Sequence, residues 1–341
     1  MTDYQSDLSA IGMNANAEIS ILKAQVVSLQ TELASTKAKS AADIALLNAE
    51  IARLNAIING TPPPVDPPPV DPPPVTPPTG LAKLKRRPPT MTSPVTIKPA
   101  DNVGTIKLSA GQDAIIELPK TRAWKNPKGL DVSGGRNVTC IGGTVDVGGG
   151  FYNSGTGPGV PGDHMVKRAA CFLGVTGTIH LEGVAFTSST GDLSEGINYS
   201  SASAIAVIQH CKHLVPLKGD KATNHADAIQ GWNGPKFLYV DNFYAETTYQ
   251  GMFLNPNDTG SGPVDNNWEL HNVEIVGLAG AKYILWVTSP PAKVITDNVY
   301  TSGGLGNWDS ANDWPGVKHG VRAPVKYAPT AGFAYVSPGY V

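Results

Sequence analysis

The chain has little charge and little cysteine. Only 16% of its 341 residues are charged, the net charge is −2 and no basic stretch dominates, which argues against a nucleic-acid partner. No run reaches 18 apolar residues, so membrane insertion is not expected. The first residues show neither the basic nor the apolar stretch of a secretory signal. Cys140, Cys171 and Cys211 form no Cys-x-x-Cys pair, and they predict buried free thiols in a reducing compartment rather than disulfides or zinc ligands.

The first 60 residues contain no proline and only two glycines. Apolar residues recur there at alternating steps of three and four, in two runs joined by a step of 11, which is one heptad plus a four-residue stutter. The two runs are Ile19, Leu22, Val26, Leu29, Leu33 and Ile44, Leu47, Ile51, Leu54, Ile58. The pattern predicts a coiled coil over residues 1–60 that forms a homo-oligomer. The alternative is a lone amphipathic helix packed on its own globular domain, and the seam alone does not decide between dimer and trimer.

Proline is concentrated in the next segment. Residues 62–78 hold 11 of the 29 prolines in a repeat of Pro-Pro-Pro-Val-Asp. Proline fixes φ and lacks an N–H, so residues 61–94 are predicted to be a rigid polyproline II linker, whose proline tract reaches about 50 Å at about 3.1 Å per residue. The alternative is a ligand for a proline-binding module. A basic cluster at the end of the linker, Lys83, Lys85, Arg86 and Arg87, is interpreted as solvated.

From residue 95 onward, short β-rich runs alternate with turn residues, and a corner pattern recurs. In this pattern two apolar residues flank two polar or glycine residues, as in Leu181-Glu182-Gly183-Val184, Val240-Asp241-Asn242-Phe243, Leu270-His271-Asn272-Val273 and, with Thr in the first position, Thr296-Asp297-Asn298-Val299. An earlier example is Ile141-Gly142-Gly143-Thr144, and an intermediate coil is predicted within 204–218. Recurrence at 20 to 30 residues predicts one solenoid turn per repeat. A Greek-key sandwich is the alternative.

These corners, together with His225–Trp232, Phe237–Phe243 and Gln250–Leu254, resemble right-handed parallel β-helix proteins of the pectate-lyase-like superfamily. The resemblance covers roughly residues 95–305. The whole layout also resembles a bacteriophage fibre or tail spike, with a slender helical start, a linker and a β-helix. That resemblance implies a mainly β chain, with a β-helix over 95–302 and a C-terminal cap over 303–341. It further implies a trimer rather than a dimer, attachment to a capsid or tail protein through the N-terminal segment, and a location on the virion surface after synthesis in the host bacterial cytoplasm.

Catalytic residues of the superfamily do not carry over onto this chain. It has no Asp-Asp pair, and Arg322-Ala323-Pro324 interrupts the last element of the polygalacturonase-like pattern. The weak catalytic candidates are His225 and Asp227, because a carboxylate can orient a histidine. The competing interpretation is a polar bend stabiliser, since Asp227 and Ile229 share a strand face. No histidine pair has metal-ligand spacing, so neither a metal nor a cofactor is predicted.

Aromatic residues are enriched late in the chain. Residues 268–341 hold 10 of the 24, among them Trp308 and Trp314. These two are the weak candidates for carbohydrate binding, while the competing role for the segment is a cap or subunit clasp. The predicted function is a phage virion appendage, a head fibre or tail spike, that binds host surface polysaccharide. The alternatives are a polysaccharide depolymerase on the same fold and a bacterial surface adhesin.

Overall fold

The computed structural model describes residues 82–148, 168–219, 225–255, 267–287, 293–303 and 314–341. All of these residues belong to the second of the two units into which the chain divides, Val75–Val341. The predicted coiled coil and the proline tract lie outside the described residues, and both stay predictions.

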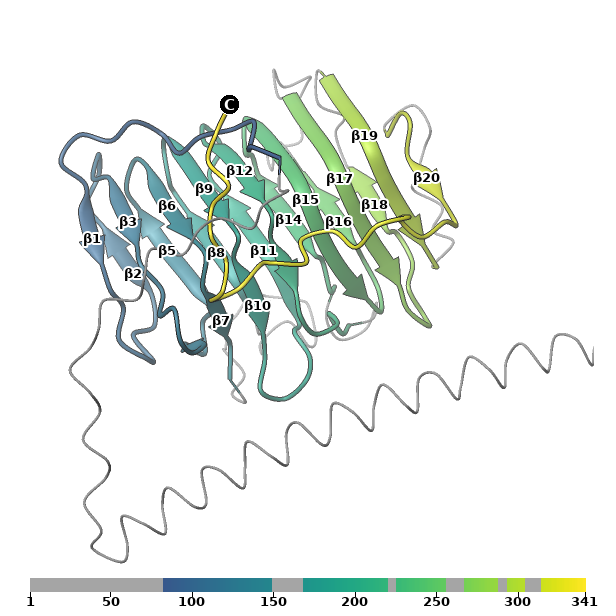
Figure 1. Ribbon diagram of the computed structural model, residues 1–341, viewed down its shortest axis with the longest axis horizontal. Coiled ribbons are helices and arrows are strands. Elements are labelled where there is room, and N and C mark those ends of the chain that lie inside the picture. The colour runs from purple at the N-terminus through teal and green to yellow at the C-terminus, as the bar shows by residue number, and fades with distance from the viewer. Residues whose placement is uncertain (1–81, 149–167, 220–224, 256–266, 288–292, 304–313) are drawn as a thin grey trace, which may run out of the picture. The chain divides into compact units, whose positions relative to one another are not determined.

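Strands are the only regular secondary structure in the described residues, and they form two sheets (Figure 1). The larger sheet contains β1 (Val95–Ile97), β3 (Ala114–Ile116), β4 (Trp124–Lys125), β6 (Val138–Ile141), β7 (Thr144–Asp146), β9 (Thr178–Glu182), β10 (Ala185–Thr187), β12 (Ile205–Gln209), β13 (Lys212–His213), β15 (Phe237–Thr247), β17 (Asn267–Gly277), β19 (Lys293–Ser302) and β20 (Lys318–His319). The smaller sheet contains β2 (Ile106–Leu108), β5 (Leu130–Gly134), β8 (Arg168–Leu173), β11 (Glu195–Ser200), β14 (Ile229–Asn233), β16 (Met252–Leu254) and β18 (Leu285–Val287).

The order of the strands gives a coil-by-coil path. The chain leaves β5 of the smaller sheet, passes through β6 and β7 of the larger sheet, and returns to the smaller sheet at β8, beside β5. The same circuit recurs with β8, β9 and β10, and every described strand pair is parallel. Repeated parallel return to the neighbouring position is the arrangement of a β-solenoid, and the antiparallel sandwich is excluded for these residues.

The predicted corner is confirmed and bends each coil within the larger sheet. Six residues in register along the solenoid adopt a left-handed backbone, with φ between 51° and 64°: Gly142, Gly183, His210, Asn242, Asn272 and Asn298. Glycine and asparagine are the residues that enter this region at least cost. His210 supplies the corner of the predicted intermediate coil, between β12 and β13.

The interior is a set of apolar stacks. Leu181, Ile208, Val240 and Leu270 pair in register on successive strands, and all are fully buried. Strand alternation places every second residue inside, so each coil adds one side chain to each stack. Burying each such side chain contributes about 1.5–3 kcal/mol. The three cysteines are free and buried, as predicted, and burial raises the pKa of the Cys140 and Cys171 thiols to about 12.

The return segment, residues 320–341, runs back along the flank of the coils. Figure 1 shows this yellow segment crossing the strands from the β19–β20 end toward β9. Arg322 bonds Glu274 of β17, the Ala328 N–H donates to the Asn242 side chain, and the Gly332 N–H donates to the Gly183 carbonyl at 2.8 Å. The described part of the segment expected to cap the solenoid end therefore packs along its side from residue 320 onward.

A clasp joins the end of the return segment to the end of the linker. Leu84 pairs with Tyr340, donating its N–H to Gly339 at 2.9 Å and accepting from the Val341 N–H at 3.0 Å. Under this bridge lies the fully buried Glu182, which accepts the hydroxyl groups of Tyr335 and Tyr340. The linker end is therefore fixed to the flank of the solenoid, ahead of β1 in the chain.

The basic cluster at the linker end is partly used in this clasp. Arg86 pairs with Glu269 at 3.1 Å, and its guanidinium lies 4.8 Å from the centre of the Tyr239 ring. Arg87 donates to the Val341 carbonyl at 2.9 Å. Lys83, Lys85 and Arg87 are exposed, in agreement with the interpretation as solvated residues, whereas that interpretation is wrong for Arg86.

Candidate functional site

The six coils that contain β5, β8, β11, β14, β16 and β18 enter the smaller sheet through the same four-position pattern. The third residue is apolar and points inward, and the fourth faces away from the core. The six copies are Lys128-Gly129-Leu130-Asp131, Arg168-Ala169-Ala170-Cys171, Glu195-Gly196-Ile197-Asn198, Asp227-Ala228-Ile229-Gln230, Gln250-Gly251-Met252-Phe253 and Tyr283-Ile284-Leu285-Trp286. Because the copies stand in register, chemically different residues at the first and fourth positions line up along the solenoid.

Small residues at the second position let neighbouring coils approach closely. A Cβ at Gly196 would lie 2.1 Å from the Ala228 carbonyl oxygen, and one at Gly251 would lie 2.3 Å from the Ile284 carbonyl oxygen. The Gly196 N–H donates to the Asp227 carbonyl at 2.7 Å. This backbone contact fixes Glu195 and Asp227 on adjacent coils.

The fourth positions form the outer row, which is polar in its first coils and aromatic in its last. Its members in order are Asp131, Cys171, Asn198, Gln230, Phe253 and Trp286. The Phe253 and Trp286 ring centres are 4.7 Å apart, and Tyr283 lies 5.7 Å from Trp286. These three rings are half-buried. Amide side chains thus stand directly beside a cluster of aromatic rings.

Trp232 extends this surface along β14. It lies two residues beyond Gln230, at an irregularity in the register of β14, and 37% of it is exposed. The Arg168 guanidinium lies 5.0 Å from the centre of the Trp232 ring, and its Nε donates to Glu195 Oε2 at 2.7 Å. A cation held over an indole ring is a favourable electrostatic contact. It fixes the orientation of the one tryptophan of this surface that is substantially exposed.

Asp227 is a buried acid in the row of first positions. Its side chain is 0% exposed, and neither carboxyl oxygen has a hydrogen-bond partner among the described residues. Burial raises the pKa of Asp227 well above its ordinary value, and the negative charge of Glu195 raises it further. The raised pKa favours the protonated form of Asp227, whereas Glu195 is held beside the Arg168 cation. The pair offers one proton donor and one charge-paired carboxylate.

The residues predicted from the sequence are distributed unevenly over this site. Asp227 belongs to it, whereas His225 is exposed and contacts Tyr249, with ring centres 5.3 Å apart. No hydrogen bond joins the His225 and Asp227 side chains, so the orienting pair is not formed. Trp314 is only 1% exposed and stacks on Trp268 in the core, 6.5 Å away, so it is not a surface platform.

Trp308 and the ten predicted oligomerisation residues lie outside the described residues. The residues that sequence reasoning missed are Arg168, Glu195, Trp232, Phe253 and Trp286. The four-position pattern, aligned from coil to coil, is the signal that would have found most of them.

No protein-family model, curated protein sequence or solved structure matches this chain. The described residues hold no group of three or more His, Cys, Asp or Glu side chains arranged to bind a metal ion. None of the described segments forms a helix long and apolar enough to cross a membrane.

Proposed function

We propose that this protein is a phage virion appendage, a head fibre or tail spike, whose right-handed parallel β-helix binds surface polysaccharide of the host bacterium. The coiled coil assembles three chains and attaches them to a capsid or tail protein, and the proline tract holds the β-helix outward. Three binding sites on each appendage multiply the avidity for a repeating polymer.

The outer row and Trp232 are the observation that carries this proposal. Sugars present apolar C–H faces that stack on aromatic rings, and hydroxyl groups that bond to amides and carboxylates. Phe253, Trp286 and Trp232 supply the rings, while the amides of Asn198 and Gln230 stand in the same row and are only 3% and 6% exposed. Among the described residues, neither the Asn198 Oδ1 nor the Gln230 Oε1 has a hydrogen-bond partner.

The binding test uses the full-length protein on an array of bacterial surface polysaccharides. For a polysaccharide that binds, replacing Trp232 by Ala should weaken binding about two- to tenfold, because one stacked ring contributes about 0.5–1.5 kcal/mol. Phe333→Ala is the matched control, since Phe333 is a 46% exposed aromatic residue on the return segment. Equal binding by both variants would contradict the assignment of the surface.

The appendage assignment has its own test. Mass spectrometry and antibody labelling of purified particles should detect the protein at a fixed copy number. Its presence on the bacterial surface and absence from particles would favour the adhesin alternative.

A depolymerase is the second candidate, and Asp227 with Glu195 favours it. Glycoside hydrolysis needs one carboxyl group that is protonated and one that is ionised, and environments that separate two pKa values assign those roles. In that role Asp227 would donate the proton to the leaving oxygen and Glu195 would act as the base or nucleophile, after a movement that exposes both groups, since they are 0% and 2% exposed.

This candidate is tested by release of reducing ends from the bound polysaccharide. Asp227→Asn and Glu195→Gln should each abolish release while binding persists. Asp192→Asn is the control for Asp227→Asn, because Asp192 also precedes a smaller-sheet strand but pairs with Lys218 at 3.6 Å. Absence of reducing ends with the unmodified protein would leave binding as the function.

A further inference from the structure

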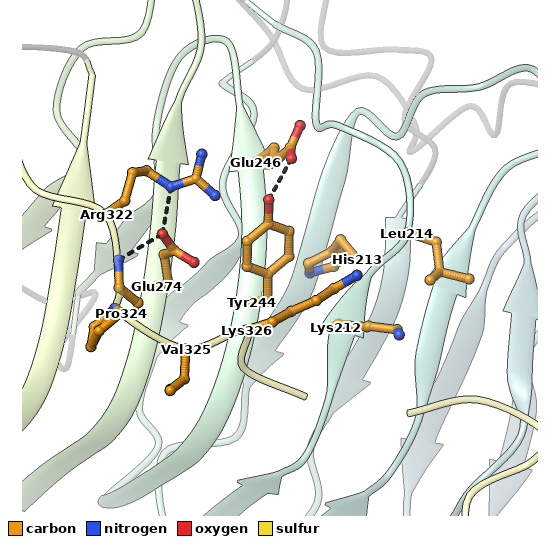
Figure 2. A pocket seen from close by; sticks show the side chains of 11 residues that line it. Lys212, His213, Leu214, Tyr244, Glu246, Glu274, Arg322, Pro324, Val325 and Lys326 are labelled. Carbon is orange, nitrogen blue, oxygen red and sulfur yellow. Dashed lines mark hydrogen bonds and ion pairs between the residues drawn. The ribbon is translucent and has the colours of Figure 1, made fainter. Parts of the chain in front are cut away.

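A cavity of about 500 Å³ lies between the return segment and strands β13, β15 and β17 (Figure 2). Cavities of about 300–1,000 Å³ are typical of small-molecule sites, so this one accommodates one or two sugar units. It is lined by Lys212, His213, Leu214, Tyr244, Glu246, Glu274 and residues 322–326. It is distinct from the smaller-sheet surface, because all its strand residues belong to the larger sheet and its edge.

One wall of this cavity is internally neutralised. Arg322 Nε donates to Glu274 Oε1 at 2.6 Å, and the Ala323 N–H donates to the same oxygen at 3.0 Å. Glu274 is 3% exposed, and its carboxylate binds the return segment through these two hydrogen bonds. Figure 2 shows the remaining guanidinium nitrogens of Arg322 directed toward Tyr244 and Glu246.

The opposite side of the cavity carries two lysines that form no ion pair among the described residues. Lys212 donates to the Pro329 carbonyl at 3.0 Å, and neither Lys212 nor Lys326 pairs with a described carboxylate. Burial lowers the pKa of Lys212, and the nearby charge of Lys326 lowers it further. Lys326 is exposed and extends across the cavity from the return segment (Figure 2). Two neighbouring ammonium groups that form no ion pair favour an anionic ligand, although the carboxylate of Glu246 lines the same cavity.

The acceptors in the same cavity suit hydroxyl groups. Glu246 Oε1 accepts the Tyr244 hydroxyl, and the other carboxyl oxygen of Glu246 has no hydrogen-bond partner among the described residues of the cavity. The half-buried Tyr244 ring forms part of the wall. Cations, a carboxylate acceptor and an aromatic ring together match an acidic sugar better than a bare inorganic anion, which would need only the cations.

A second cavity, of about 350 Å³, adjoins the first and shares Val325 and Lys326 with it. It is lined by Lys83 and Lys85 of the linker end, and by Asp241 beside the asparagine corner. Lys326 thus stands between two cavities, with Lys212 on one side and the linker lysines on the other. The arrangement suits a chain of charged units rather than a single one.

We propose that the two cavities along the return segment bind an anionic oligosaccharide, with its acidic groups at Lys326 and Lys212 and its hydroxyl groups at Glu246. This inference rests on the proposed glycan-binding function and specifies an acidic class of polymer. Carboxylate and phosphate groups share the required chemistry, and the experiment separates them.

The experiment is isothermal titration of the full-length protein with three hexamers: galacturonate, glycerol phosphate and neutral glucose. One anionic hexamer should bind more tightly than the neutral one, and its affinity should fall as salt is raised. Lys326→Glu should weaken that binding about tenfold, because it reverses the charge between the cavities. Lys326→Met should weaken it less. Lys107→Glu, at an exposed lysine of β2 that lines neither cavity, should leave it unchanged.

Equal affinity for neutral and anionic hexamers, or an unchanged affinity in Lys326→Glu, would overturn this proposal. Thermal unfolding of each variant shows whether the return segment is still docked. Trp232→Ala separates the two sites: a loss of polymer binding in that variant, with hexamer binding intact, means that both proposals hold. If the Trp232→Ala variant still binds polysaccharide on the array, the smaller-sheet surface is not the polysaccharide site. That result would not contradict the proposal for the two cavities.

Discussion

At the scale of single residues, the corner asparagines combine a backbone requirement with a chain of side-chain bonds. Asn242 has φ of 58°, and its amide nitrogen lies 3.0 Å from His210 Nδ1 on the preceding coil. Asn272 donates in turn to Asp241 at 2.8 Å. Each of these asparagines therefore adopts the left-handed backbone conformation, and its side chain forms a hydrogen bond with the preceding coil.

Replacing Asn242 by Ala should lower the free energy of unfolding by about 1–3 kcal/mol, because alanine is strained in this region and the bonds are lost. Asn242→Gly removes the same bonds without the strain and should cost less. Chemical denaturation measures both. Equal loss in the two variants would mean that backbone conformation contributes nothing at this corner.

The contribution of Glu182 to the stability of the clasp depends on pH. Burial acts to raise its pKa, but hydrogen bonds from His180, Ser337 and Tyr340 outweigh burial and bring the pKa below its ordinary value of 4.5. A carboxyl group with a lowered folded-state pKa stabilises the fold above pH 4.5, and this contribution is lost as the pH falls through the folded value.

Glu182→Gln should therefore destabilise the protein at pH 7 by about 1–3 kcal/mol, the cost of impairing buried charged hydrogen bonds. The difference from the unmodified protein should shrink as the pH falls below 4.5. Glu117→Gln is the control, since Glu117 pairs with Lys98 at 3.2 Å on an exposed surface. Unfolding curves of both variants and of the unmodified protein between pH 3 and pH 7 measure this difference. A difference that does not change with pH would contradict the role of the Glu182 charge.

At the scale of elements, Gly183 couples the corner to the return segment. Its φ is 64°, and a Cβ there would lie 2.0 Å from the Tyr335 ring. Gly183→Ala should therefore displace the Tyr335 end of the return segment, in addition to the backbone strain. Gly148→Ala is the control that introduces the backbone strain without a steric clash, because φ at Gly148 is 73° and nothing lies within 4 Å of its Cβ position.

Hydrogen exchange of residues 330–341 measures this displacement. Protection should be lost in Gly183→Ala and kept in Gly148→Ala. Loss in both variants would mean that the return segment responds to general destabilisation and not to the contact with Gly183.

The sequence predicted the corners because a corner is local. Two apolar residues flanking Asn or Gly specify both the inward stack and the left-handed turn within four positions. The return segment was not predictable in this way, since Tyr340 reaches Glu182 across 158 positions. Asp227 was found from its neighbours in sequence, but its partner Glu195 stands on the adjacent coil. The spacing between coils varies too much for a simple repeat to reveal that pairing.

At the scale of the whole molecule, assembly is predicted to depend on the first 60 residues. Replacing Ile51 and Leu54 by Asp places charges in the predicted seam and should convert the trimer into monomers, with the thermal transition of the β-structure unchanged. Ala49→Asp with Ala52→Asp adds the same charges outside the seam and should preserve the trimer. Analytical ultracentrifugation measures the mass. A monomeric unmodified protein, or a trimeric seam variant, would contradict the coiled coil.

The clasp at Leu84 also determines where the solenoid receives mechanical load. Tension transmitted through the linker meets the bridge to Tyr340 and the bonds of Arg86 to Gln209 and Glu269 before it reaches β1. Those contacts lie on β12 and β17, each of which pairs with a strand on both sides, whereas β1 is the last strand at its end of the described sheet and pairs with β3. A strand at the edge can be peeled away one hydrogen bond at a time. A pulling force therefore acts first on coils that are hydrogen-bonded on both sides, and it reaches β1 only after those contacts break.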